Sequence, residues 1–119
     1  MRYPPSERAR DALLAMRENI GRAQGLVRTA TALTLAEDWA RLYAVVRCLE
    51  IISEASRRLS DEMLARHPDI DWRRLKDAGN VYRHVYDALD ASLILNTVIE
   101  ALPPLSRAVD AEISPPETS

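Results

Sequence analysis

The sequence is poor in several residue types that many folds and sites require. Its 119 residues include one cysteine, three glycines, two histidines and no phenylalanine. Because Cys48 is alone, the chain cannot form an internal disulfide. Nothing close to it in the sequence would lower its pKa, so we expect a small buried residue and not a nucleophile. With few glycines and no clean alternation of β-branched residues, but abundant Ala, Leu and Arg, the composition predicts an all-α fold.

Long apolar runs are also missing. No apolar run follows a basic start, as it would in a secretory signal. No stretch approaches the roughly 20 apolar residues that span a membrane. We therefore expect a cytoplasmic protein without a membrane partner.

Neither sign of charge dominates. The formal net charge is -2 and the pI is about 5.7, whereas nucleic-acid-binding domains are often strongly basic. A local positive excess nevertheless runs from residue 66 to residue 84 and includes Arg73, Arg74 and Lys76. These three are candidate RNA-binding residues, and a solvated helical face is the alternative explanation of the pattern.

The length suggests one domain. A chain of this size can bury a single core without disulfides or metal ions. We assign residues 1–113 to one helical domain and residues 114–119, which include two prolines, to a disordered tail. The first helix is expected to begin after Ser6, as its N-cap, and to end around Gly25 to Arg28.

The longest apolar stripe lies in the helix expected next. Thr34 is its predicted cap, with Glu37 three residues later completing a capping box. The stripe is wide enough to contact more than one neighbour, either in a bundle or across a dimer interface. Its members are Trp39, Leu42, Tyr43, Val46, Leu49, Ile52, Ala55, Ser56 and Leu59.

Shorter helical segments follow. A turn that Ser60 opens must stop before Pro68, because the residue before a proline disfavours the α conformation. Asp71 is the predicted cap of the next helix, and Asp90 is the predicted cap of the one after. We expect the prolines at 103 and 104 to kink or end that helix, with a final helical segment at 105–113.

Chemically distinctive side chains concentrate between residues 71 and 90. If this stretch is helical, Asn80 and His84 are four residues apart on one face, and Arg83 borders that face. An imidazole can move a proton near neutral pH, a guanidinium can stabilise a pentacoordinate phosphate, and an amide can orient either group. Such roles suit metal-free RNA cleavage, in which a base activates the ribose 2′-hydroxyl. A structural, hydrogen-bonding histidine is the alternative.

Patterns typical of other chemistries are absent from the sequence. His67 and His84 are not at metal-ligand spacing, and the nearby aspartates form no recognisable cage, so we expect no metal and no cofactor. A phosphate-binding loop, a dinucleotide fingerprint and a catalytic serine or cysteine triad are also missing. Tyr86 can either stack on a base or fill the core.

Several segments match, in order, the pattern of a known family. They are the opening helix with Arg10, then Arg47-Cys48-Leu49-Glu50-Ile51-Ile52-Ser53-Glu54-Ala55, His67-Pro68, Asp71-Trp72, and Asn80-Val81-Tyr82-Arg83-His84-Val85-Tyr86. Over nearly its whole length the chain resembles the HepT-like toxins of the HEPN superfamily. The usual signature of that family is Arg-Asn, three variable residues, His, one variable residue and Tyr.

The resemblance implies both a fold and a function. The fold would be an up-and-down bundle of four to five helices that forms a homodimer around a cleft. The function would be that of a metal-independent endoribonuclease, the toxin of a toxin-antitoxin pair. A minimal nucleotidyltransferase antitoxin would neutralise it by contact or by transferring AMP to the signature tyrosine. Asn80 and His84 match the catalytic amide and imidazole, and Tyr86 matches the AMP acceptor.

The chain departs from the signature at one position. Gly79 occupies the place of the signature arginine, which removes a positive charge that would stabilise the phosphate. Arg83 is the predicted replacement, because a long guanidinium stem can reach the same cleft from the adjoining face. Arg73 and Arg74 are more distant substitutes. Without any substitute the missing contact would cost several kcal/mol, on the order of a hundredfold in rate.

Three hypotheses follow. The leading one is a homodimeric ribonuclease toxin in which His84 is the general acid or base, Arg83 the relocated cation and Asn80 the orienting residue. The second is a degenerate helical module that binds a nucleotidyltransferase or a nucleotide without cleaving RNA, and Gly79 favours it. The third is a purely structural helical dimer, which leaves the polar cluster unexplained.

Overall fold

The computed structural model describes residues 5–81 and 88–114, and for residues 77–81 and 88–90 it describes the backbone alone. The helical elements of these ranges follow one another in the order α1 (Glu7–Leu26), α2 (Ala32–Glu37), α3 (Trp39–Ser56), α4 (Asp61–Ala65), α5 (Trp72–Val81), α6 (Ala88–Asn96), the π-helical turn η2 (Thr97–Ala101) and α7 (Leu102–Ile113).

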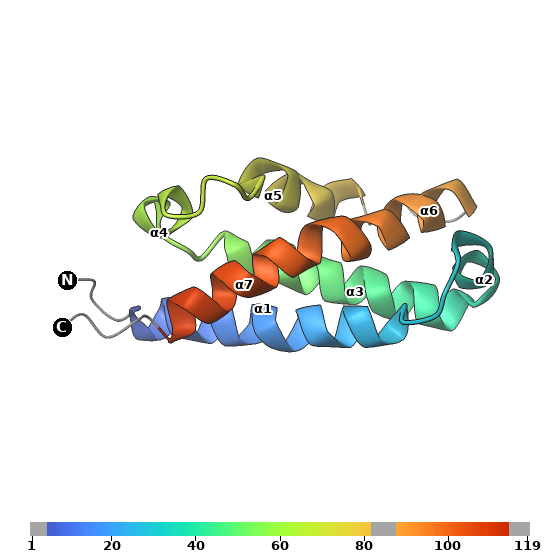
Figure 1. Ribbon diagram of the computed structural model, residues 1–119, viewed down its shortest axis with the longest axis horizontal. Helices are drawn as coiled ribbons and strands as arrows, with labels where there is room; N and C mark the ends of the chain where they lie inside the picture. Colours follow the sequence, from blue (N-terminus) through green and yellow to red (C-terminus); the bar gives the residue numbers. More distant parts are fainter. Residues whose placement is uncertain (1–4, 82–87, 115–119) are drawn as a thin grey trace.

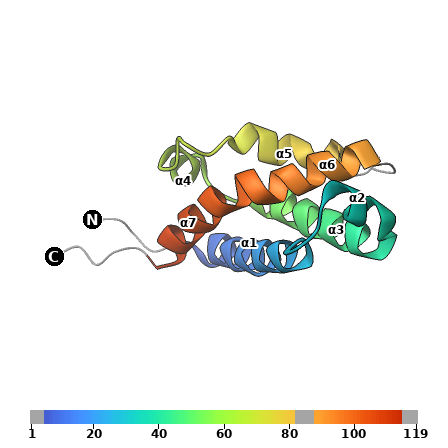
Figure 2. The ribbon, with the colours of Figure 1, turned by 45° about the vertical axis from the view of Figure 1, so that its right-hand side comes forward.

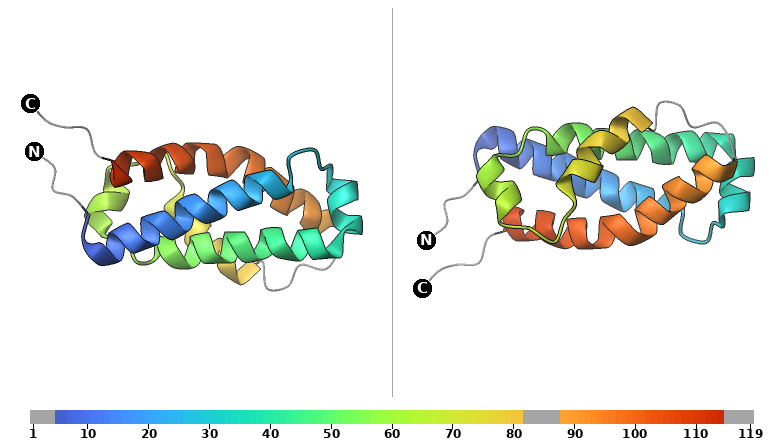
Figure 3. Two further views of the ribbon diagram at one scale, coloured as in Figure 1. Left: turned by 90° about the horizontal axis from the view of Figure 1, so that it is seen from below. Right: turned by 90° about the horizontal axis from the view of Figure 1, so that it is seen from above.

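The long helices form an up-and-down bundle (Figure 1). Helices α1 and α3 run antiparallel and make the most extensive contact of the fold, α5 lies along α3, and α7 lies along α1. Helix α6, η2 and α7 continue one another as a single rod across the bundle (Figures 2 and 3). The described residues contain no strand, and the all-α prediction is confirmed.

Helices α1, α3, α6 and α7 share one hydrophobic core. Its fully buried side chains include Leu13, Met16 and Ile20 of α1, Val45 and Ile52 of α3, Ile94 of α6, and Leu105 and Val109 of α7. The first turn of α1 also meets the end of α7, where the Arg10 guanidinium donates to the Ile113 carbonyl at 3.5 Å. None of the helices in the described ranges is both long and apolar enough to cross a membrane.

Several helix ends lie where local chemistry predicts them. The Ser6 hydroxyl accepts from the Ala9 N–H at 3.2 Å and caps α1. The Asp71 carboxylate accepts from the Arg74 N–H at 3.0 Å at the start of α5. Helix α4 ends before Pro68, as expected. The predicted cap at Asp90 is wrong, because α6 begins two residues earlier, at Ala88.

The region before α3 differs from the prediction. Thr31, and not Thr34, is the N-cap of a short separate helix, and the two threonines form a reciprocal capping box. Asp38 separates this helix from α3 and caps α3, because its carboxylate accepts from the Arg41 N–H at 3.1 Å. Thr31 and Thr34 can each cap a helix. The Asp38 side chain caps a new helix, so that α2 and α3 are separate.

The first turns of α3 depart from the predicted apolar stripe. Leu42, Val46, Leu49 and Ile52 are buried, but Trp39 and Tyr43 are 68% and 52% exposed. Their rings instead pack on each other edge to face, with centroids 5.8 Å apart. The periodicity therefore identifies the buried face correctly except where α3 extends past its neighbours.

The two prolines neither end nor break the last rod. Pro103 and Pro104 lie in the first turn of α7, directly after Leu102, where proline is tolerated. The wider turn η2 precedes them and absorbs the change of hydrogen-bonding pattern. The predicted segment at 105–113 forms the main part of α7.

Candidate active site on helix α5

The predicted catalytic residues fall at and beyond the end of α5. Asn80 belongs to the last turn of this helix, where only the backbone is described. Arg83, His84 and Tyr86 lie outside the described residues. What the structure supplies is the arrangement of the helix that leads into them.

The three candidate RNA-binding residues lie on two sides of α5. Arg73 and Lys76 are three residues apart, so they share a face of the helix with position 80. Arg73 is exposed and Lys76 is half-buried. Arg74 is exposed on an adjoining face, where it lines a hollow of about 170 Å³ between the start of α5 and η2.

That hollow carries mainly negative charge. Asp69, Asp71 and Glu100 line it together with Arg74, and Leu75 and Pro104 contribute part of its apolar wall. Three carboxylates beside one guanidinium oppose the approach of a phosphate. Of the three candidates, Arg74 is therefore the one least suited to bind RNA.

Two side chains from α3 and its C-terminal cap donate hydrogen bonds to the same backbone carbonyl of α5. The Lys76 carbonyl oxygen accepts from the Ser53 hydroxyl at 3.1 Å and from the Arg57 guanidinium at 2.7 Å. Ser53 is 1% exposed, whereas Arg57 is exposed at the C-terminal end of α3. These two residues fix the position of the α5 backbone four residues before Asn80. We call Ser53, Arg57 and the Lys76 carbonyl the carbonyl clamp.

Sequence reasoning did not identify the clamp. Ser53 lies in one of the segments that carry the family resemblance, but the sequence indicates no role for it. One signal was present, because Ser53 is a polar residue in a largely apolar helix and Arg57 lies one helical turn later on the same side. Their acceptor is a backbone oxygen, which a pattern of side chains cannot indicate.

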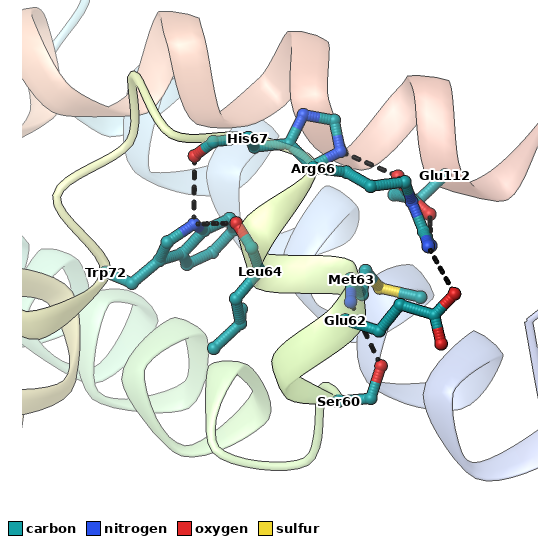
Figure 4. Close-up of polar contacts among 8 residues, drawn as sticks. All are labelled: Ser60, Glu62, Met63, Leu64, Arg66, His67, Trp72 and Glu112. Carbon is teal, nitrogen blue, oxygen red and sulfur yellow. Dashed lines mark hydrogen bonds and ion pairs between the residues drawn. The ribbon is translucent and has the colours of Figure 1, made fainter.

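The opposite end of this region is held by a buried carboxylate. Glu112 of α7, whose side chain is 4% exposed, accepts from Arg66 at 2.6 and 3.1 Å and lies 2.7 Å from His67 Nε2. Figure 4 shows both side chains turned toward Glu112. The hydrogen bond to Glu112 is the main reason that the pKa of Arg66 is raised.

The Trp72 indole closes the same end. Its N–H lies 3.0 Å from the Leu64 carbonyl and 3.1 Å from the His67 carbonyl (Figure 4). The loop between α4 and α5 is thus tied to α7 by charge and to the first residue of α5 by the indole. We call Arg66, His67, Trp72 and Glu112 the buried network.

Other candidate chemistries have no site in the described part of the chain. No group of three or more His, Cys, Asp or Glu side chains there is arranged to hold a metal ion. Cys48 is buried, and burial raises the pKa of its thiol. A protonated, inaccessible thiol is a poor nucleophile, in agreement with the expected small core residue.

The described residues form an all-α bundle with basic residues on helix α5, which defines the chain as an all-α helical protein. Residues 16–112 match the family model described as Ribonuclease HepT-like, which covers most of the chain. The chain belongs to this HepT-like family of the HEPN superfamily.

Individual relatives match only part of the chain, at moderate identity. The chain is 34% identical over 68 residues to "Putative RNase MJ1380" of Methanocaldococcus jannaschii, an alignment that covers 57% of this chain and 62% of the relative. It is 36% identical over 63 residues to "Probable ribonuclease HepT" of Thermococcus cleftensis, covering 53% and 57%. The matched part spans about three fifths of these relatives. No solved structure matches the chain.

Proposed function

We propose that this protein is a metal-independent endoribonuclease toxin of a HepT-type toxin-antitoxin system, acting as a homodimer. The observation that carries the proposal is the family match over residues 16–112, together with the segment from Asn80 to Tyr86 in the order of the signature. The two relatives support the same function, since both are named as ribonucleases.

The proposed reaction uses two signature side chains, Asn80 and His84, together with Arg83, which stands at a variable position of the signature. His84 removes the proton from a ribose 2′-hydroxyl, and the resulting oxygen attacks the adjacent phosphorus. The bond from phosphorus to the 5′-oxygen breaks, and the leaving oxygen takes up a proton from water, while His84 later returns its proton to the solvent. Arg83 offsets the charge that grows on the phosphate, and Asn80 orients the reacting groups. The products are a 2′,3′-cyclic phosphate and a 5′-hydroxyl.

Tyr86 is the proposed site of control. A minimal nucleotidyltransferase antitoxin would transfer AMP to its hydroxyl, with pyrophosphate leaving from ATP. The added nucleotide brings bulk and negative charge to a place where an RNA phosphate must bind, so it would oppose binding directly. Tyr86→Phe should take up no AMP from such an enzyme, and AMP on a different residue would contradict the assignment.

The first experiment is cleavage of end-labelled RNA by the full chain in excess chelator. His84→Ala, purified identically, controls for contaminating nucleases. We expect 2′,3′-cyclic phosphate ends with the parent and none with the variant. Equal cleavage by both proteins, or none by either while both are folded and free of AMP, would contradict the nuclease function.

Gly79 favours one rival function. A HepT-like module without the signature arginine could bind a nucleotidyltransferase partner or a nucleotide and cleave nothing. Arg83→Ala separates the two. A nuclease should lose nearly all activity while remaining folded, whereas a binding module should show at most a change in affinity.

A further inference from the structure

A guanidinium from the neighbouring helix α3 lies beside α5, close to the position of the missing signature arginine in the sequence. Gly79 lies in the last turn of α5, in place of the signature arginine. Three residues before it is Lys76, about 4.5 Å earlier along the helix axis. The Lys76 carbonyl oxygen is the atom that the Arg57 guanidinium contacts, at 2.7 Å.

We propose that Arg57 binds a phosphate of the RNA substrate beside α5 and so supplies, from α3, a positive charge that Gly79 does not provide. The proposal rests on the function proposed above and adds one phosphate-binding residue to the same site. It comes from the contact between two helices and not from the signature, in which position 57 has no part.

The hydrogen bonding of Arg57 leaves most of its donors available. A guanidinium carries five N–H donors, and the contact with the Lys76 carbonyl is the side-chain hydrogen bond that the structure records for it. No carboxylate of the described residues forms an ion pair with Arg57. Arg22, Arg41, Arg47 and Arg66 each have such a partner.

The position of Arg57 is also fixed before any ligand arrives. Its backbone caps the end of α3 by donating to the carbonyls of Glu54 and Ala55, and its side chain is tied to α5. An exposed guanidinium that is already oriented loses less conformational freedom on binding a phosphate than a free one does. Arg58, the next residue, is exposed, and among the residues whose side chains the structure describes it makes no comparable contact with α5.

Arg74 and Lys76, two of the three basic residues of α5, are less suitable for this role. Arg74 faces the acidic hollow formed with Asp69, Asp71 and Glu100. Lys76 is half-buried, and its compact ammonium cannot bind a phosphate through two parallel N–H donors, as a guanidinium does. Arg57 therefore combines a guanidinium with direct contact to the carbonyl of Lys76, which lies three residues before Gly79.

The test is RNA affinity measured without cleavage. The full chain carrying His84→Ala binds a labelled single-stranded RNA at several salt concentrations, alone and with Arg57→Gln or Arg58→Gln as the matched control. We expect Arg57→Gln to weaken binding about fivefold to tenfold at low salt and to reduce the salt slope by about 0.7, the value for one phosphate contact. Arg58→Gln should change affinity less than twofold. Equal effects of the two variants would overturn the proposal.

A second variant separates charge from position. Adding Gly79→Arg to Arg57→Gln should restore at least half of the lost affinity if the missing element is a positive charge beside the last turn of α5. A merely structural role of the clamp would not be rescued in this way, so a lack of rescue would count against the proposal.

Two further outcomes also decide it. If circular dichroism shows Arg57→Gln to be unfolded, Arg57→Lys keeps the charge, and a normal salt slope with Lys supports the proposal while a reduced slope overturns it. If the unmodified chain binds RNA but does not cleave it, the nuclease function fails and the affinities still decide the role of Arg57. If it binds no RNA at all, both proposals fail.

Discussion

The buried network and the carbonyl clamp use positive charge in opposite ways. In the buried network, Arg66 and His67 converge on a carboxylate that is nearly inaccessible to water. In the carbonyl clamp, Arg57 remains exposed and meets a neutral oxygen. A charge that is fully paired inside the protein contributes to structure, whereas one held at the surface with spare donors is available to a ligand. The comparison predicts that the network controls stability and the clamp controls binding.

Glu112→Gln tests the stabilising role of the buried network and should have the largest effect. This change leaves Arg66 and His67 without their carboxylate, and removing one partner of a buried ion pair costs about 3 kcal/mol or somewhat less here, because Arg66 is partly exposed. Urea unfolding should show the loss. Glu62→Gln is the matched control, since its 3.6 Å pair with Arg66 has an 88% exposed carboxylate. A control variant as destabilised as Glu112→Gln would contradict the distinction.

A smaller loss is expected from Trp72→Phe. The change removes the N–H near the Leu64 and His67 carbonyls and should cost about 1 to 2 kcal/mol. Trp39→Phe is the control at an exposed position, where we expect a change within about 0.5 kcal/mol. The midpoints of thermal unfolding, followed by circular dichroism, test both. Equal shifts for the two tryptophans would show that the indole hydrogen bonds contribute nothing.

Within the clamp, Ser53→Ala should affect stability more than Arg57→Gln does. The Ser53 hydroxyl is buried against the Lys76 carbonyl, and its loss should cost about 1 kcal/mol. Arg57 is exposed, so its replacement should change the free energy of unfolding by less than about 0.5 kcal/mol. Urea unfolding of the two variants gives the comparison. A larger loss for Arg57→Gln would assign the exposed guanidinium a structural role.

The smallest effect is expected for Cys48, in the middle of α3. Burial raises the pKa of this thiol above its ordinary value of 9.0, so the folded chain keeps a proton that the unfolded chain releases. The contribution of Cys48 to stability should therefore be constant well below pH 9 and fall as the pH rises through that value, because the unfolded chain releases the proton first. Cys48→Ala should lack this part of the decline. Parallel pH profiles for parent and variant would contradict the prediction.

Local chemistry made much of the fold predictable. Ser6 and Asp71 cap helices because each has an acceptor within reach of an N–H three residues later, and such contacts involve only neighbouring residues. Competition between equivalent signals explains the error before α3, where Thr31 and Thr34 can each cap a helix and their reciprocal bonds select Thr31. Trp39 and Tyr43 fit the apolar period, but whether a neighbour covers them depends on where the other helices end.

The candidate site was less accessible from the sequence. Arg66 and Glu112 are 46 residues apart, and no local pattern pairs them. Arg57 is paired with a backbone oxygen that every residue possesses, so only the crossing of α3 and α5 selects Lys76. The signature residues Asn80, His84 and Tyr86 came from family resemblance, and their roles remain proposals.

The contrasting surroundings of the two tryptophans give the protein an internal pair of fluorescent reporters. Trp39 is largely exposed to water and packs edge to face against Tyr43, so a soluble quencher such as iodide should reach it readily. Trp72 is half-buried and hydrogen-bonded at the root of α5, so it should emit at shorter wavelength and resist quenching. In a Trp39→Phe variant, emission would then report selectively on the helix that carries the candidate site, without any attached dye.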